Sequence, residues 1–195
     1  MKKVLAVCAF TLFSASIFAQ LSGGIRLGMN LANQKQEFNG ESLNGSSKIG
    51  VLGGLYLVAN VTEKFAIQPE FVFSALGSTD PDFDDIKYNF NYISVPVMLR
   101  YNLTENFNLQ AGPQLGLLMS AKASDGDTST DLKDDMKGID FGAAFGAGVD
   151  FGKFNAGARY YLGFSDIADV AAEPDLSIKN SGFQIFLGYR LFGGE

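Results

Sequence analysis

Residues 93–101 read Ile-Ser-Val-Pro-Val-Met-Leu-Arg-Tyr. Large apolar side chains occupy every odd position from Ile93 to Tyr101, whereas the even positions carry Ser, Pro, Met and Arg. Alternation with period two is typical of a β-strand, because successive side chains point to opposite faces of the strand. The stretch therefore predicts a strand with one apolar face and one mixed face.

The same alternation recurs along the chain and predicts eight strands in all. It is found at 25–31, 65–74, 107–119, 139–150, 154–163 and 183–191. The remaining strand, at 48–60, is apolar at both odd and even positions, so the sequence does not show which of its faces points outward. The joints alternate as well: long polar connections at 33–47, 77–87, 120–138 and 165–180, and short ones at 60–64, 102–106 and 152–153. Within the third long connection we expect one helical turn, at 131–137.

Length and composition exclude several classes of protein. The chain has 195 residues, 23 Gly, 18 Phe, one Cys, no His and a formal charge of −6. This length suits one domain. Without His, the Ser-His-Asp and Cys-His relays and His-ligated zinc are unavailable, and one Cys makes no disulfide framework. We therefore expect no enzyme and no cofactor, and the acidic charge argues against a nucleic-acid partner.

The first residues have the order of a secretory signal. Met1-Lys2-Lys3 is a short positive start, residues 4–18 are apolar or small, and Ala19-Gln20 offers a small residue at the cut. We expect residues 1–19 to be removed and residues 20–195 to form the mature domain. No later apolar run is long enough for a membrane-spanning helix.

Two barrels fit eight alternating antiparallel strands. A soluble periplasmic barrel would bind a lipophilic ligand inside an apolar lumen, whereas a membrane barrel turns its apolar face outward. Here the other face consists mainly of Gly, Ala, Ser, Asn and Gln, with spaced glycine pairs such as Gly112/Gly116. Small residues suit the narrow interior of an eight-stranded barrel. The sequence thus predicts an all-β, eight-stranded antiparallel up-and-down transmembrane β-barrel in the outer membrane.

Aromatic residues next to the short turns support the outward facing. Phe65, Phe107 and Phe154 each follow a short turn, and Tyr101 and Phe151 each precede one. Aromatic side chains at one level are typical of a membrane–water interface. Short periplasmic turns alternating with long external loops then place both termini in the periplasm.

Several strands resemble a known family. The stretches that carry the likeness are 92–101, Ala111-Gly112-Pro113-Gln114-Leu115-Gly116, 140–149, 158–163 and 187–191. They are similar to the PorT-like outer-membrane β-barrel proteins of Bacteroidota, within the OmpA-like group of eight-stranded barrels. One member type of that family is implicated in protein secretion, and the resemblance implies a fold more than a function.

Charged residues lie on the inward parity, where an unpaired ion is costly. They are Arg26, Glu70, Arg100, Asp140, Asp150, Arg159 and Arg190. We expect them to pair across the lumen as a polar core that fills it; an ion path is the alternative. On this basis Gln110→Ala should be nearly silent, whereas Leu109→Arg on the lipid face should cost about 2–4 kcal/mol.

The long connections carry clustered acids. Asp82 and Asp84 lie in one cluster, and Asp125 and Asp127 lie in another. These oxygens are weak candidates for a Ca²⁺ or Mg²⁺ site, since their spacing does not match an EF-hand, and solvated loop tips are the favoured interpretation. Phe83 is a candidate contact for an external partner.

The sequence favours a non-enzymatic, monomeric barrel in outer-membrane lipid. Its expected role is a structural anchor, a loop-presenting adhesin-like protein or an envelope-assembly component, with an envelope or extracellular protein bound through the acidic loops. A minor transport, gating or secretion-associated component is the first alternative. The soluble lipophile-binding barrel is the second.

Overall fold

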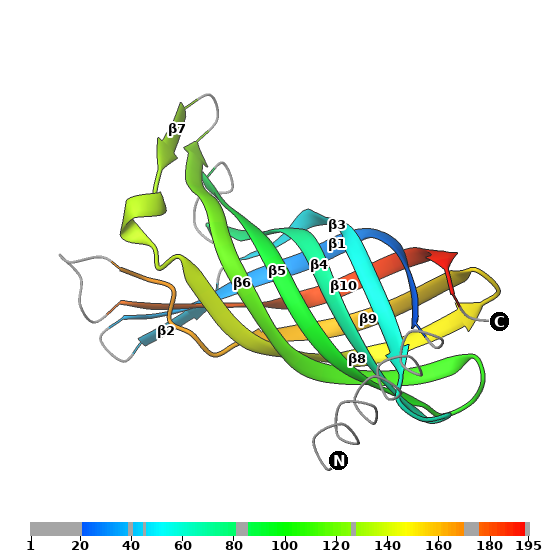
Figure 1. The fold of residues 1–195 in the computed structure, drawn as a ribbon. Coiled ribbons are helices and arrows are strands. Elements are labelled where there is room, and N and C mark those ends of the chain that lie inside the picture. The colour runs from blue at the N-terminus through cyan, green and yellow to red at the C-terminus, as the bar shows by residue number, and fades with distance from the viewer. Residues whose placement is uncertain are drawn as a thin grey trace, which may run out of the picture.

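The computed structural model describes residues 21–38, 41–44, 46–80, 86–125, 128–169 and 176–193. They form one antiparallel sheet that closes into a barrel, since β1 pairs with β3 on one side and β10 on the other (Figure 1). The wall strands are β1 (Leu21–Phe38), β3 (Ser46–Asn60), β4 (Phe65–Thr79), β5 (Ile86–Asn102), β6 (Phe107–Asp125), β8 (Ile139–Phe151), β9 (Phe154–Gly163) and β10 (Ser177–Phe192). The predicted eight-stranded barrel is confirmed.

Two short strands and one helical turn extend this wall. Strand β2 (Glu41–Asn44) pairs with β1, and β7 (Thr128–Asp131) pairs with β6. The 3-10 turn η1 (Lys133–Asp135) lies where one helical turn was predicted. No helix in the described ranges is long and apolar enough to cross a membrane.

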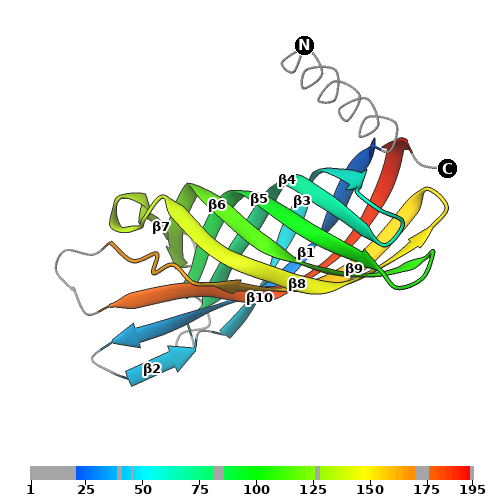
Figure 2. The ribbon, with the colours of Figure 1, turned by 60° about the horizontal axis from the view of Figure 1, so that its bottom comes forward.

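The barrel has two different ends. At the turn end the wall strands are joined by the short segments 61–64, 103–106 and 152–153, and Gly23 of β1 lies opposite Phe192 of β10. At the loop end the long connections emerge, and the extensions with β2 and β7 project beyond the wall (Figure 2). Residues 1–20, which include the predicted signal segment, lie outside the described residues.

The strands run farther into the long connections than the sequence predicted. Strand β1 continues to Phe38, β6 continues to Asp125, and β10 already begins at Ser177. Each extension finds a pairing partner, as in the ladder between Lys35 on β1 and Lys179 on β10. Backbone pairing thus continues into polar sequence, where the apolar alternation has already ended.

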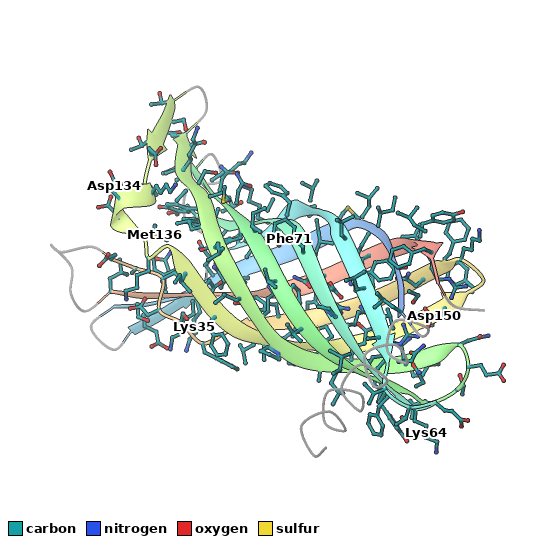
Figure 3. The ribbon with its side chains drawn as sticks, in the orientation of Figure 1. Lys35, Lys64, Phe71, Asp134, Met136 and Asp150 are labelled. Carbon is teal, nitrogen blue, oxygen red and sulfur yellow. The ribbon has the colours of Figure 1, made fainter. Side chains whose placement is uncertain are left out.

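The apolar face of the barrel points outward. Ile67, Leu109 and Val149 are 44%, 43% and 42% exposed, and Phe71, labelled in Figure 3, belongs to the same outer surface. The inward parity carries buried polar residues instead, such as Gln68. The prediction of an outward apolar face is confirmed, and the soluble barrel with an apolar lumen is wrong.

Strand β3 resolves the one facing that the sequence left open. Its outward positions include Val51 and Leu55, whereas Leu52, Tyr56 and Val58 are buried inside. Leu52 packs in the lumen with an apolar residue of β4 and one of β10. This strand is apolar on both faces because the lumen contains small apolar clusters among its polar groups.

Aromatic rings gather on the outer wall at the turn end. Phe65 lies 5.0 Å from Tyr101 between ring centroids, and Phe154 lies 6.0 Å from Phe151 and 5.1 Å from Tyr189. The predicted aromatic level is therefore present, with pairs of rings on adjacent strands.

Candidate functional site

Three buried charges from three strands meet in the middle of the lumen. The Glu70 carboxylate on β4 lies 2.5 Å from Nη1 of Arg26 on β1 and 2.7 Å from Nη2 of Arg159 on β9. Nη1 of Arg159 donates to the second oxygen of Glu70 at 3.0 Å, so Arg159 binds this carboxylate through both oxygens. All three residues are at most 4% exposed. One carboxylate is thus the counterion of two guanidinium groups. We call Arg26, Glu70 and Arg159 the ion triad.

A chain of hydrogen bonds continues from the ion triad to the turn end. Arg159 Nε donates to Gln110 at 2.8 Å, and Gln110 donates to Asn108 at 2.6 Å. Asn108 then donates to Asp150 at 3.1 Å, and Asp150 pairs with Arg100. Arg26, Glu70, Arg159, Asp150 and Arg100 thus belong to one connected network. Such continuity fixes the side chains in one arrangement.

One phenylalanine ring supports both arginines of the ion triad. Phe186 on β10 has its ring centroid 3.8 Å from the Arg26 guanidinium carbon and 4.7 Å from that of Arg159. Cations over an aromatic face are attracted by the negative face of the ring. Gly157 makes room for this ring, because a Cβ there would lie 2.5 Å from the ring edge. The alternation in the sequence did not indicate that an inward phenylalanine ring would stack against two guanidinium groups.

Asp140 lies in a separate layer nearer the loop end. Its Oδ2 accepts a hydrogen bond from Asn180 at 2.9 Å, and Gln34 donates to Asn180 at 3.0 Å. Ser78 donates in turn to Gln34 at 2.9 Å, which links four strands. Asp140 forms no ion pair with any described residue. The expectation that every inward charge pairs with an opposite one therefore does not hold for Asp140, because no arginine projects into this layer.

Arg190 departs from that expectation as well. Its Nη2 donates to the Gly152 carbonyl at 3.0 Å, and no ion pair of the described residues includes it. It lines a cavity of about 210 Å³ at the turn end, together with Arg100, Lys153 and Asn155. This part of the lumen is wide enough for water, so Arg190 keeps partial solvation.

Side chains fill the middle of the lumen. The void beside the ion triad, bordered also by Gln114 and Gln184, measures about 10 Å³. That is about the space of one water molecule. Eight strands leave an interior that side chains can fill, and here they do so.

The loop end is closed by an apolar cluster, which we call the plug. Ile167 and Met136 come from the long connections and pack on Phe90, Tyr92 and Leu118 of the wall. Ile167 is fully buried. The plug buries hydrocarbon at the mouth of a polar lumen, so the hydrophobic effect holds the two connections onto the barrel.

Backbone contacts join the same two connections. Met136 forms an isolated bridge with Ala168, and the amide of Lys137 donates to the Ile167 carbonyl at 2.9 Å. The amide of Asp169 donates to the Asp135 carbonyl, also at 2.9 Å. We call these contacts the loop lock.

Asp166 anchors the loop lock. Its carboxylate accepts the amides of Ile178 at 2.9 Å and Ala168 at 3.1 Å, and it lies 3.3 Å from Lys137 Nζ. Burial raises the pKa of Asp166, but the two amides and the Lys137 ammonium outweigh burial and hold this pKa below its usual range. The side chain is thus a carboxylate at neutral pH, which is the form that these contacts need.

Only one of the four weak candidates for a metal site lies among the described residues. Asp82, Asp84 and Asp127, together with Phe83, lie outside the described residues, and Asp125 is exposed at the end of β6. Among the residues that the structure describes, no group of three or more Asp, Glu, His or Cys is placed to hold a metal ion.

The sequence matches a known family over most of this barrel. Residues 18–169 match the family described as "Outer membrane protein beta-barrel domain". The chain belongs to this outer-membrane β-barrel family. The outward apolar wall and the closed strand ladder are what a bilayer requires, because a closed barrel leaves no unpaired strand edge in lipid. No curated protein matches the sequence of this outer-membrane barrel.

Several solved structures are similar to this chain at low sequence identity. The outer-membrane barrel is similar to Neisserial surface protein A, with a TM-score of 0.51, 10% identity and coverage of 86% of this chain and 97% of that one. It also matches Ail, the attachment invasion locus protein of Yersinia pestis, with a TM-score of 0.49, 19% identity and coverage of 88% and 99%. OprG from Pseudomonas aeruginosa matches with a TM-score of 0.41, 14% identity and coverage of 89% and 95%. The first of these supports the fold.

Proposed function

We propose that this outer-membrane barrel is a non-conducting, non-enzymatic anchor that presents a rigid loop platform outside the cell. The observation that carries the proposal is the loop lock seated on the plug, with Ile167 fully buried beneath it. A platform held by both packing and backbone hydrogen bonds loses little entropy when a partner binds. This suits an adhesin-like or envelope-assembly role in which the loop end contacts another protein.

The lumen supports the non-conducting part of this proposal. An ion would have to pass the ion triad, where the void is about 10 Å³, and then the plug. Each barrier has a different chemistry, so one local motion would not open both. Open channels belong to barrels with about twice as many strands.

The proposal includes a subgroup within the family and an orientation in the membrane. A PorT-like barrel of Bacteroidota is the subgroup that the strand sequences resemble, and the orientation with both termini in the periplasm follows the usual placement of short turns. A secretion-associated role would use the loop end or the turn-end cavity as a docking surface and would still need no current through the lumen.

Planar-bilayer recording tests the closed lumen. We expect no steady current from the wild-type barrel across a broad voltage range. The turn-end cavity, lined by Arg100, Lys153 and Arg190, is the feature that would favour transport. A steady, ion-selective current would therefore replace the anchor proposal with the transport alternative.

Cysteine labelling in intact cells tests the orientation. The chain's single cysteine, Cys8, lies in the predicted signal segment, so Thr130→Cys on β7 and Thr62→Cys in a short turn give matched reporters. A membrane-impermeant maleimide should label position 130 in intact cells and position 62 only after the outer membrane is opened. The reverse pattern would contradict the proposed orientation.

A further inference from the structure

The apolar band of the outer wall ends at the loop end in small polar residues. Along β1 the outward side chain changes from Leu31 to Asn33, and along β10 it changes from Phe183 to Ser181. Outward positions on three further wall strands change in the same way, at Ser47, Asn91 and Ser120. These residues mark the level at which the wall leaves the hydrocarbon, because apolar side chains face lipid tails and polar ones face the interface.

Two lysines face each other just beyond that level. Lys35 on β1 lies directly opposite Lys179 on β10, two residues past Asn33 and Ser181. Lys35 shares the outward parity of Leu31 and appears at the loop end in Figure 3. Directly opposed residues of antiparallel strands have Cβ atoms about 4.5–5.5 Å apart, and like charges at this spacing are destabilising. An anion between the two ammonium groups would remove that repulsion.

The protein neutralises this pair only in part. Lys35 lies 2.5 Å from Glu37, but the two side chains are 49% and 44% exposed, so water screens their attraction. Lys179 forms no ion pair among the described residues, although it lies near enough to Glu37 to attract that carboxylate, so one acid is shared by two lysines. Lys122 on β6, by contrast, lies directly opposite Asp131 on β7. The Lys35–Lys179 pair therefore keeps positive charge available for a ligand.

On the part of the wall that the structure describes, the turn end has no such pair. Tyr189 of β10 and Phe154 of β9 occupy the outward level there, with their rings in contact. Lys64 and Lys153 lie within the short turns instead of on the wall. Aromatic side chains lie near both membrane boundaries, since Phe183 also contacts Tyr160 below the loop end. The difference between the two boundaries is the opposed lysine pair, which the described wall carries only at the loop end.

We propose that Lys35 and Lys179 together bind the phosphate of a lipid headgroup in the leaflet at the loop end. This rests on the proposed orientation, which makes that leaflet the outer one, and the lipid is then its phosphorylated glycolipid, lipid A. Its acyl chains would lie along the apolar wall below, at Leu31 and Phe183, which fixes the height of the phosphate. Long lysine side chains reach such an interface while their stems cover apolar surface.

Lipid A retention by purified barrels tests the site. Wild-type protein and variants are placed in phosphatidylcholine nanodiscs with a small fraction of lipid A, and bound lipid A is counted by native mass spectrometry. Each lysine near an anionic surface contributes about 1 kcal/mol, so Lys35→Gln with Lys179→Gln should lower lipid A affinity about 30-fold. The matched control, Lys64→Gln with Lys153→Gln, should retain lipid A like the wild type, as should Lys35→Arg with Lys179→Arg.

The chemistry of the ligand is tested in the same nanodiscs. Dephosphorylated lipid A should bind the wild type as weakly as lipid A binds the double Gln variant, and excess inorganic phosphate should displace little lipid A. Equal retention by wild type and the double Gln variant would overturn the site. Full displacement by inorganic phosphate would overturn the lipid as its source.

Folding and orientation are controlled separately. Lys179→Gln removes both the repulsion of Lys35 and an attraction to Glu37. In vesicles without lipid A this variant should therefore be about as stable to urea as the wild type, and a clear loss of stability would show that the protein itself already neutralises Lys179. The nanodisc result does not depend on which way the barrel faces in cells. If the nanodiscs show lysine-dependent binding of lipid A but cysteine labelling places the loops inside the cell, only the orientation is refuted. If labelling places the loops outside but lipid A binding does not depend on the two lysines, only this site is refuted.

Discussion

The middle of the lumen and its loop end are closed by opposite chemistries. In the middle, Glu70 is shared by Arg26 and Arg159, and hydrogen bonds extend the contact to several wall strands. At the loop end, Ile167 and Met136 fill the mouth with hydrocarbon supplied by the connections. The middle therefore depends on charge and on directed hydrogen bonds, whereas the plug depends on buried apolar area, so truncating the plug should loosen the loop end without disturbing the wall.

Removing the shared carboxylate should have the largest effect. Glu70→Ala leaves two buried guanidinium groups without a counterion, and breaking a buried ion pair costs about 3–5 kcal/mol. We expect that loss in the free energy of unfolding, measured by urea titration of the barrel in lipid vesicles. A loss below about 1 kcal/mol would mean that water already solvates the triad and that the middle is not a sealed layer.

A charge on the lipid face should come next. Leu109→Arg places a cation in the bilayer and should cost about 2–4 kcal/mol near the midplane. Its inward neighbour Gln110 was expected from the sequence to be replaceable, but it accepts from Arg159 and donates to Asn108. Gln110→Ala should therefore cost about 1–3 kcal/mol, because it leaves the Nε donor of Arg159 and the Oδ1 acceptor of Asn108 without these partners. Equal and small losses for both variants in the same urea titration would contradict the facing and the network together.

Opening the plug should be a local event. Ile167→Ala removes fully buried hydrocarbon and should cost about 2 kcal/mol, at the low end for such truncations because a loop can partly collapse. Hydrogen exchange at the amides of Lys137 and Asp169 should accelerate, while the amides of the wall strands stay protected. Bilayer recording should still show no steady current, because the ion triad remains. A current from this variant alone would show that the plug is the only barrier.

Acidification should have the smallest effect of these changes, a weakening of the loop lock. The pKa of Asp166 is lower in the folded protein than its ordinary value of about 3.9, so its contribution is fully present above that value and is lost as the pH falls through the folded-state pKa. Exchange at the Ala168 and Ile178 amides, which both donate to Asp166, should rise only below about pH 4. In Asp166→Asn the same amides should exchange with no such dependence.

The candidate site was predictable only in part from the sequence. Alternation correctly placed Arg26, Glu70 and Arg159 on the inner face, because facing depends only on the parity of a residue within its strand. It did not reveal that Asp140 would lie in a layer without arginine. Which inward residues meet depends on strand tilt and stagger, and these are set when the sheet closes.

The strands, their outward apolar face and the contrast between short and long joints could all be predicted from the sequence, since each is a local pattern of side chains along the chain. Three contacts depend on how the barrel closes: the sharing of Glu70 by two arginines, the stacking of Phe186 against both of them, and the packing of Ile167 at the loop end. Arg159 and Glu70 are separated by 89 positions in the chain and meet only because the barrel closes. A period of two carries no information on that closure, so these contacts follow from the curvature of the sheet and the path of its loops.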